Sequence, residues 1–542
     1  MQKQTLDHQE VEWQFEAADL DLVENWLAEH PSASGLAVIP EATKELLDTY
    51  YDTEDWRFYR AGYALRVRRD GESFEATMKS LTPAEGALRQ RREISEPLEG
   101  NARSPKGTRG PVGERVRRLA GARALRPLFE VRTHRRTFAL RPERPSADGG
   151  VVEDTSGNIR QRGTEGEPTL GEVALDETEI SGDAPTRLSR IEIEVASDTG
   201  LGVEGFVDEL LDALELQPTE TSKFRSGLSA AGLRPEVAPD LGPTEVDASM
   251  SAGEVAFAIL RRHFATMLAH EPGVRLGEDP EELHDMRVAT RRLRATLKLY
   301  SGALPKRAGR YERDLHYVAN ALGEVRDLDV HLQRLAGEAS RNGEVLEEVV
   351  AVLEQRRVEA RRRMFEALDS NRYERLVSSF SGTLRRGRSP APTRPILEEA
   401  PDLVRRRYKR VRKDVDGLTE DSPPEEFHDL RKKGRRLRYA LEPLQEIYGK
   451  PAKKMIKLLK TVQDDLGEHQ DLVVAAALME ELGVAGDLPP RAVFSMGSMA
   501  GRYTRDTAKM RANLLGSKPF RALRRGKSWK LLRKEMREKV GG

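Results

Sequence analysis

The sequence HDMRVATRRLRATL at residues 284–297 returns as HDLRKKGRRLRYAL at residues 428–441, which lie 144 positions further along the chain. A second motif, LGE at residues 322–324, returns as LGE at residues 466–468 with the same offset. Two separate motifs that agree on one repeat length indicate an internal duplication. On a helix with about 100° per residue, an arc of roughly 80° holds His284, Arg287, Arg291, Arg294 and Lys298. The chain is therefore predicted to build one cationic helix edge twice.

This helix edge is locally unfavourable. Arg287 and Arg291 stand four residues apart, and so do Arg294 and Lys298. Each like-charged pair costs about 0.2 to 0.5 kcal/mol in an isolated helix. Either acids on other helices pair with these bases, since 33% of the residues are charged, or an anionic ligand offsets the repulsion. Because the pattern occurs twice, with a histidine each time, we favour a groove for a polyanion lined by both copies.

The composition limits the class of protein. A chain of 542 residues is too long for one core and predicts two to four compact units. Residues 1–240 contain 31 Lys and Arg against 45 Asp and Glu, whereas residues 241–542 contain 59 against 45. The acidic part suits metal coordination or solubility. The basic part indicates a phosphate-rich partner, such as nucleic acid, polyphosphate or anionic lipid.

The lack of cysteine and the lack of a long apolar segment exclude several classes of protein. The chain has no cysteine, which excludes disulfides, thiolate metal sites and thiol catalysis. The first residues show no apolar signal core, and the apolar run that starts at Leu472 is shorter than the roughly 20 residues of a membrane-spanning helix. We expect a cytoplasmic protein that does not enter a membrane.

Seven segments of the first part alternate between charged and apolar residues. They are EVEWQF (10–15), ALRVRR (64–69), SFEATMKS (73–80), RQRREI (89–94), RRTFAL (135–140), GEVALDE (171–177) and SRIEIEV (189–195). A period of two predicts strands with one dry face and one ionic face. A sheet of such strands, curled with its charges inside, would enclose a polar tunnel.

The rest of the chain is predicted to be helical. Pro235, Pro239 and Pro243 mark residues 233–250 as a linker. Asp279 with Pro280, and Ser422 with Pro423, are helix-start signals just before the two repeated motifs, so both motif histidines fall in the first turns of their helices. Residues 526–542 are predicted to be a basic tail.

The strands carry charges in a pattern that suits phosphate chemistry. Glu10 and Glu12 share one strand face, as do Glu192 and Glu194, and bases two residues apart recur on other strands. Carboxylates coordinate hard cations such as Mg²⁺ or Mn²⁺, and bases bind phosphate oxygens. Together they meet the needs of phosphoryl transfer.

The order EVEWQF, YYDT (50–53), ALRVR, ATMK (76–79), RRE (91–93), ALDE (174–177), IEIEV and SKF (222–224) resembles a CYTH domain of the triphosphate tunnel metalloenzymes over residues 8–232. This resemblance implies an eight-stranded antiparallel tunnel that hydrolyses a phosphoanhydride. It implies metal ligands at Glu10, Glu12, Glu192 and Glu194, of which Glu10 and Glu12 are the catalytic candidates. It implies substrate-binding residues at Arg66, Arg68, Lys79, Arg91, Arg135 and Lys223. Gln14 departs from the family's Glu-x-Glu-x-Lys motif and provides a neutral amide where a lysine is usual.

The repeated His-Asp-x-Arg helices, each followed by Leu-Gly-Glu, resemble a CHAD domain over residues 251–525. This resemblance implies two helical bundles related by pseudo-twofold symmetry around a basic channel for inorganic polyphosphate. The implied ligands are His284, Arg287, Arg291, Arg294, Lys298, His428, Arg431, Lys432, Arg435 and Arg438. Glu442 takes the place of Lys298, so the halves are not equivalent. The histidines have arginine neighbours that would repel a metal ion, and each could instead serve a core hydrogen bond.

We therefore expect an α+β multidomain protein with an N-terminal β tunnel and a C-terminal all-α duplicated bundle. The expected function is a metal-dependent inorganic triphosphatase that cleaves tripolyphosphate with Mg²⁺ or Mn²⁺, joined to a module that binds long-chain polyphosphate. The alternative, which Gln14 supports, is a non-catalytic polyphosphate-binding or granule-associated protein. Nucleic acid receives less weight because the rear motifs carry few aromatics for base stacking. The sequence leaves the oligomeric state open.

Overall fold

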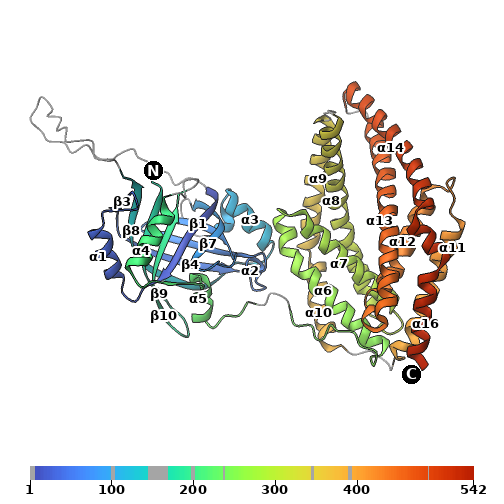
Figure 1. Cartoon of the computed structure of the whole chain (residues 1–542), viewed down its shortest axis with the longest axis horizontal. Helices are drawn as coiled ribbons and strands as arrows, with labels where there is room; N and C mark the ends of the chain where they lie inside the picture. The colour runs from blue at the N-terminus through green and yellow to red at the C-terminus, as the bar shows by residue number, and fades with distance from the viewer. Residues whose placement is uncertain are drawn as a thin grey trace, which may run out of the picture. The chain divides into compact units, whose positions relative to one another are not determined.

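The computed structural model describes residues 6–98, 104–143, 169–196, 202–235, 239–342, 347–387, 393–485 and 488–541. The chain divides after residue 237 into two compact units, whose helices and strands are labelled in Figure 1. The first unit contains the sheet, and the described part of the second unit consists of helices. The expected fold class, a β tunnel followed by an all-α region, is confirmed.

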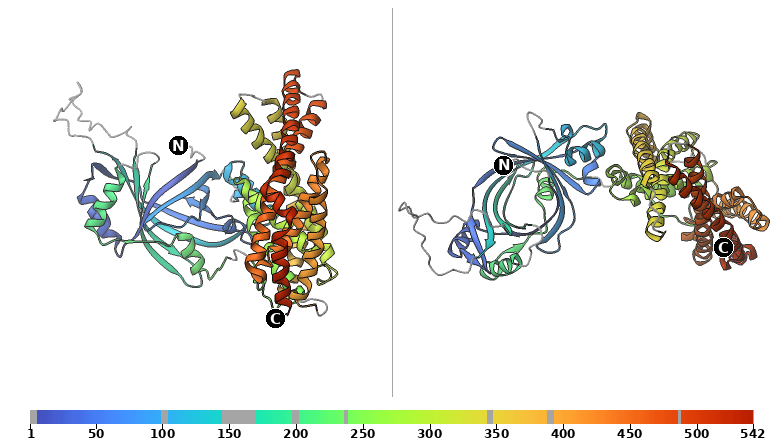
Figure 2. Two further views of the ribbon diagram at one scale, coloured as in Figure 1. Left: turned by 45° about the vertical axis from the view of Figure 1, so that its right-hand side comes forward. Right: turned by 90° about the horizontal axis from the view of Figure 1, so that it is seen from above.

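Eight strands of the first unit close into a barrel. They are β1 Leu6–Glu16, β4 Lys44–Asp52, β5 Tyr63–Asp70, β6 Ser73–Ser80, β7 Leu88–Leu98, β8 Arg126–Pro142, β9 Gly171–Ile180 and β10 Thr186–Val195. Neighbouring strands pair antiparallel in the order β8-β4-β5-β6-β7-β1-β10-β9, and β9 pairs back with β8. The ring of strands is visible from above in Figure 2. The short strands β2 Ser32–Ala33 and β3 Leu36–Pro40 extend the sheet beside β8, and β11 Gln217–Pro218 pairs with β1.

The period of two places charge inside the barrel and apolar residues outside it. On β1, Glu10, Glu12 and Gln14 are buried, while Phe15 packs under helices α1 Leu20–Glu29 and α4 Val203–Ala213. The apolar core of this unit therefore lies between the outer face of the barrel and these helices. The remaining helices of the unit are α2 Arg57–Arg60, α3 Pro111–Ala120 and α5 Lys223–Ala230, with a 3₁₀ turn at Pro105–Gly107.

The helices of the second unit follow the repeat seen in the sequence. The first copy contains α6 Ala252–Leu276, α7 Pro280–Leu299, α8 Ala308–Asn342, α9 Glu347–Leu368 and α10 Asn371–Arg386. The second copy contains α11 Ile396–Gly417, α12 Pro424–Leu441, α13 Gln445–Val484, α14 Pro490–Gly516, α15 Lys518–Arg525 and α16 Lys527–Gly541. Helices α6 and α11 start 144 positions apart, and so do α7 and α12. The offset found in two motifs thus holds for whole helices.

Local sequence explains where these helices start and bend. The Asp279 carboxylate accepts a hydrogen bond of 2.8 Å from the Glu281 amide and caps α7 as predicted. At α12 the corresponding cap is Pro423, without a side-chain hydrogen bond, so the role predicted for Ser422 is not seen. Helix α13 contains one non-helical residue, Gly449, whose φ of 53° is easily adopted only by glycine.

Two segments pack more closely than their sequence suggests. Leu241 and Val246, in the predicted linker, are buried in the core of the helical unit. The segment predicted to be a basic tail is helix α16, which buries Leu532 and Met536 in the same core. Their four-residue spacing puts both side chains on one helix face. Among the described helices, none combines the length and apolar character needed to cross a membrane.

Candidate functional site

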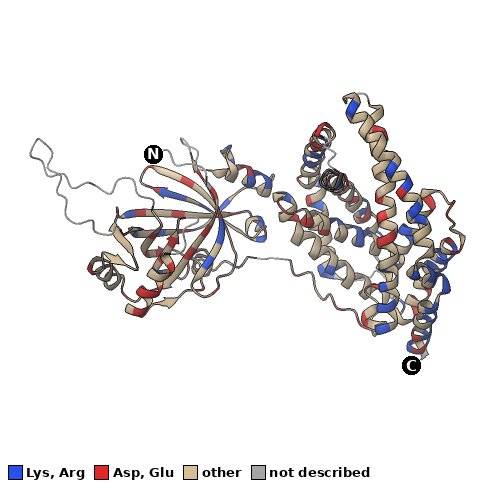
Figure 3. Cartoon of the chain, turned by 45° about the horizontal axis from the view of Figure 1, so that its top comes forward, with Lys and Arg blue, Asp and Glu red and all other residues tan. Residues whose placement is uncertain are grey.

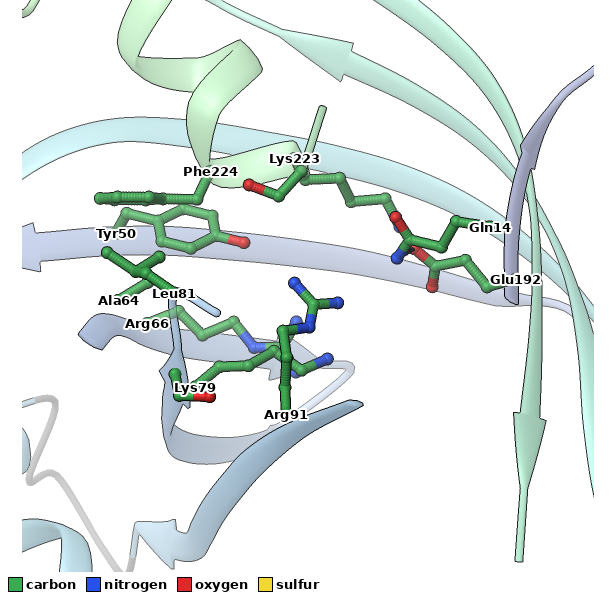
Figure 4. A pocket seen from close by; sticks show the side chains of 12 residues that line it. Gln14, Tyr50, Ala64, Arg66, Lys79, Leu81, Arg91, Glu192, Lys223 and Phe224 are labelled. Carbon is green, nitrogen blue, oxygen red and sulfur yellow. Dashed lines mark hydrogen bonds and ion pairs between the residues drawn. The ribbon is translucent and has the colours of Figure 1, made fainter. Parts of the chain in front are cut away.

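The inner face of the barrel brings the predicted acids and bases of the first unit together. Both glutamates lie on β1, where Glu10 is opposite Arg91 of β7 and Glu12 is opposite Glu194 of β10. Figure 4 shows Arg66, Lys79 and Arg91 reaching into the same space as Lys223 and Glu192. Tyr50 and Phe224 complete the wall of this pocket.

The predicted metal-side and phosphate-side residues are each other's partners. The Nζ atom of Lys79 lies 2.6 Å from Oε1 of Glu10 and 3.2 Å from Oε2 of Glu93. Arg91 donates a hydrogen bond to Glu12. Burial alone would raise the pKa of Glu93, but Lys79 and Arg66 lower it to about 2. The carboxylate of Glu93 therefore carries full charge at neutral pH.

Two aspartates that the sequence does not single out hold the other bases. Asp48 accepts hydrogen bonds from Arg68 at 2.7 and 2.8 Å and lies 3.4 Å from Arg66. Burial opposes its charge, but these two arginines bring the pKa of Asp48 well below its usual value. Asp176 accepts from Arg135 at 2.7 and 2.6 Å and also from Lys223. Both aspartates are almost fully buried, so they fix the bases in one orientation.

Gln14 joins the two carboxylate pairs. Its Nε2 donates to Glu12 at 3.0 Å and to Glu192 at 3.1 Å. Glu192 also accepts from Arg135 at 2.5 Å and lies 3.0 Å from Lys223. Although burial opposes it, Lys223 and Arg135 lower the pKa of Glu192 well below its usual value.

The acidic side chains fit a divalent cation in their chemistry, although they are engaged in ion pairs. Glu194 differs from the other acids in its pKa, which burial and the nearby Glu10 raise to about 7. One oxygen of Glu10, Oε2, is buried and has no hydrogen-bond partner in the described part of the chain. A cation here would offset the repulsion between the two carboxylates. Within the described ranges, no cluster of three or more acids and histidines converges closely enough to hold a metal.

In the helical unit, helices α7, α11 and α12 form a cavity of about 240 Å³, called here the basic cavity. Its wall contains seven cationic side chains and no acid: Arg291, Arg294, Lys298, Arg407, Lys432, Arg435 and Arg436. Five of them were predicted. Arg407 and Arg436 were not, because neither lies on the predicted helix edge. Lys and Arg residues of these helices are blue in Figure 3.

Some of the predicted phosphate-binding bases pair with acidic side chains of the same domain. Arg294 and Lys298 share Glu312 at 3.0 and 2.9 Å. Arg287 pairs with Asp327 at 2.9 Å, and Arg438 with Glu442 at 3.5 Å. Lys432 has an exposed pair with Asp429 at 3.8 Å.

Other bases have no carboxylate within ion-pair distance in the described part of the chain. Across the described residues, no carboxylate oxygen lies within 4.0 Å of Arg291, Arg407, Arg431, Arg435 or Arg436. Burial, and the nearby Arg291, lower the pKa of Arg435 to about 10. Arg291 donates its Nε hydrogen to the Tyr439 hydroxyl at 2.8 Å. A multivalent anion would remove the repulsion within this group.

The histidines and glycines of the repeated motifs lie near arginines of the two cationic helix edges. Burial lowers the pKa of His284 and His428, helped by Arg326 for the first and Lys432 for the second. Both rings therefore favour the neutral form more than an exposed imidazole does. A Cβ on Gly467 would lie 3.1 Å from the guanidinium of Arg431, so the glycine of the second Leu-Gly-Glu motif makes room for that side chain.

Comparison with known proteins covers both units. The family model described as "CYTH domain" matches residues 8–228, and the one described as "CHAD domain" matches residues 258–480. An uncharacterized protein of Mycobacterium tuberculosis, found in two strains, is 24% identical over 513 residues, which are 90% of this chain and 92% of that protein.

Two similar solved structures each cover about half of this chain. The CHAD domain of the plant Ricinus communis is 29% identical, with a TM-score of 0.44, over 51% of this chain and 96% of that one. PptA from Streptomyces chartreusis is 18% identical, with a TM-score of 0.39, over 52% of this chain and 100% of that one. The barrel, the duplicated helices and the two family matches lead to one conclusion: the chain carries a CYTH domain followed by a CHAD domain.

Proposed function

We propose that the protein binds inorganic phosphate chains in both domains and that the CYTH tunnel hydrolyses short chains such as tripolyphosphate. The CHAD domain would hold long-chain polyphosphate. The observation that carries this proposal is the basic cavity, in which four guanidinium groups line one space without a carboxylate within 4.0 Å in the described part of the chain. A phosphate chain bears about one negative charge per unit and would neutralise several of these groups at once.

The tunnel supports the hydrolytic part of the proposal. The bases that Asp48 and Asp176 hold in place would bind phosphate oxygens without reorganising, which is the main requirement of phosphoryl transfer. Members of the CYTH superfamily are metal-dependent, and Glu10, Glu12, Glu192 and Glu194 would hold the cation. A bound Mg²⁺ or Mn²⁺ supplies a Lewis acid for a phosphoryl oxygen.

The ion pairs within the tunnel suggest how substrate and cation would enter. Lys79 and Arg91 now neutralise Glu10 and Glu12. When a triphosphate binds, both bases turn to its oxygens, and the two carboxylates become available for the cation. Phosphate and metal would then favour each other's binding.

The test is phosphate release from tripolyphosphate by the full-length protein, with Mg²⁺, with Mn²⁺ and with a chelator. Glu10→Ala and Glu12→Ala are each expected to abolish metal-dependent release. Glu179→Ala is the matched control, because Glu179 is an exposed glutamate of the same barrel that pairs with the exposed Arg187. Full activity in both Glu10→Ala and Glu12→Ala would remove the assigned site.

A second candidate function is binding without turnover, and Gln14 favours it. A neutral amide provides weaker stabilisation of developing charge than the lysine usual at this position. Tight binding of tripolyphosphate, with no release of phosphate under any divalent cation, would establish this function instead.

The polyphosphate part has its own test. Arg291→Ala with Arg435→Ala is expected to abolish retention of long-chain polyphosphate and to leave tripolyphosphate cleavage unchanged. Competition separates phosphate chains from nucleic acid. If RNA displaced polyphosphate at equal charge concentration, the assignment to inorganic chains would be wrong.

A further inference from the structure

Each residue of the basic cavity has an equivalent in the other copy of the repeat, 144 positions away. These equivalent residues together are called here the counterpart of the basic cavity. Because α6 and α7 start 144 positions before α11 and α12, the equivalences follow from the numbering. Arg291 and Arg435 are each other's equivalents, so both belong to the basic cavity and to its counterpart. Of the five remaining cations, only Arg294 and Arg436 map onto arginines, which are Arg438 and Arg292.

The counterpart has lost the other three cations. Glu442 stands in place of Lys298, Val288 in place of Lys432 and His263 in place of Arg407. Burial lowers the pKa of His263 to about 3, and Arg292 and Arg262 act in the same direction, so this imidazole is neutral at pH 7. The two sites therefore differ strongly in charge.

Glu442 also neutralises the arginines that the counterpart retains. Its carboxylate lies 3.1 Å from Nη2 of Arg292 and 3.5 Å from Nη1 of Arg438. Apart from Arg291 and Arg435, the counterpart thus has two cations, and both pair with Glu442. The basic cavity has five, of which Glu312 pairs with two and Asp429 loosely with one.

Tyr439 adds a second difference between the sites. It lines the basic cavity, and its repeat equivalent is Ala295. The hydroxyl of Tyr439 receives the Nε hydrogen of Arg291, and the ring lies 5.8 Å below the guanidinium carbon. Tyr439 thereby orients a shared arginine, and its equivalent, Ala295, has no hydroxyl that could do the same for Arg435.

We propose that the duplicated domain is one-sided: a run of phosphates binds at Arg291, Arg407, Arg435 and Arg436, and the counterpart around Glu442 takes none. This inference rests on the proposed binding of polyphosphate by the CHAD domain. A phosphate entering the basic cavity relieves repulsion between unpaired cations. A phosphate entering the counterpart would have to displace a carboxylate that is already in place.

The repeat provides a matched pair of variants for the test. Arg436→Ala and Arg292→Ala remove equivalent arginines, one from each site. Binding of polyphosphate of one defined length to the full-length protein is measured by calorimetry over a range of salt concentrations. Arg436→Ala is expected to weaken binding roughly tenfold and to reduce the slope of log K against log[salt] by about one, because it removes a phosphate contact. Arg292→Ala is expected to change neither quantity.

A third variant tests for gain of function. Glu442→Lys gives the counterpart the lysine that the basic cavity has at the equivalent position, Lys298. The change also removes the carboxylate that pairs with Arg292 and Arg438. We expect tighter binding and a steeper salt slope. Equal weakening by Arg292→Ala and Arg436→Ala, or no gain in Glu442→Lys, would overturn the one-sided site. Absence of binding by the unmodified, folded protein would instead overturn the proposed function. Circular dichroism of each variant confirms that the fold is intact.

Discussion

The ammonium of Lys79 lies 2.6 Å from the carboxylate of Glu10, so a predicted phosphate ligand and a predicted metal ligand of the tunnel neutralise each other. Both atoms are at least partly shielded from water, where such a charge-assisted hydrogen bond is strong. The charges of these two side chains therefore balance each other. Its two ligands are expected to compete with this internal pair, which makes the pair a direct target for experiment.

Lys79→Gln is expected to have opposite effects on the two ligands. Removal of the ammonium frees Glu10 and tightens Mn²⁺ binding in the absence of phosphate, by about tenfold if the lost competition equals 1.4 kcal/mol. The same change weakens tripolyphosphate binding. Electron paramagnetic resonance measures the first effect, and calorimetry the second. Arg187→Gln, at an exposed position, is the control. A change of both affinities in the same direction would contradict the ion-pair exchange.

Gln14→Lys is expected to raise turnover of tripolyphosphate. The amide of Gln14 lies 3.0 Å from Glu12 and 3.1 Å from Glu192, so a lysine would fit between two acids that balance its charge. Hydrogen bonds from charged donors are about twice as strong as neutral ones, and a gain of about 1.4 kcal/mol in the transition state corresponds to tenfold in kcat/KM. Initial rates of phosphate release measure it. Unchanged rates would show that this position does not limit catalysis.

Asp48→Asn is expected to destabilise the barrel by about 3 to 5 kcal/mol, because it leaves Arg66 and Arg68 buried without their acid. Three of the four tryptophans, Trp13, Trp26 and Trp56, lie in this unit, so tryptophan fluorescence during unfolding reports mainly on it. Asp183→Asn, at an exposed position, is expected to have little effect. Added tripolyphosphate should stabilise Asp48→Asn more than the unmodified protein, since the freed arginines gain a new partner.

Gly467→Ala and Gly323→Ala separate stability from binding in the CHAD domain. Both add a good helix former within a helix, which stabilises by up to about 1 kcal/mol. The Cβ at residue 467 meets the Arg431 guanidinium at 3.1 Å, whereas at residue 323 the contact with Arg287 is an ordinary 3.7 Å. Only Gly467→Ala should therefore weaken polyphosphate binding. Equal affinities for the two variants in calorimetry would exclude a role for the position of Arg431.

The stability of the barrel should depend on pH through Glu194. Its pKa is raised to about 7 in the folded protein by burial and by Glu10, from an ordinary value of 4.5. The folded state then binds the proton more tightly than the unfolded state, so this contribution is complete below pH 4.5 and is lost as the pH rises through 7. The full shift corresponds to roughly 3 kcal/mol. With a chelator present, Glu194→Gln should gain Tm relative to the unmodified protein between pH 5 and pH 8. A constant difference in Tm would contradict the raised pKa.

Much of the barrel could be predicted from the sequence, because burial on one face imposes a period of two on each strand. The seven alternating segments all lie in barrel strands. The eighth strand, Lys44–Asp52, was represented only by the YYDT motif of the family resemblance. Its segment KELLDTYYD has no regular alternation of charge, so the position of Asp48 inside the tunnel could not be predicted. The role of Asp176 was missed for a related reason: a single aspartate in a strand gives no sign of which bases will face it.

In the helical domain the repeat predicted the two cationic edges, but not which of their residues line one cavity. Arg407 lies on α11, outside both repeated motifs, and reaches the cavity only because α11 packs beside α12. The buried residues of α16 were overlooked because the many bases of that segment obscure a short apolar stripe.

The amino-acid sequence by itself determined the two-domain organisation, the strand faces and the duplication, because each is a periodic pattern along one chain. The partners of the charges were decided by the tertiary structure alone. A pair of arginines four residues apart occurs in both copies of the repeat, yet Arg287 pairs with Asp327 at 2.9 Å, while its equivalent Arg431 has no carboxylate oxygen within 4.0 Å among the described residues. Electrostatic balance depends on distances of a few ångströms between segments far apart in the chain, and only folding sets those distances.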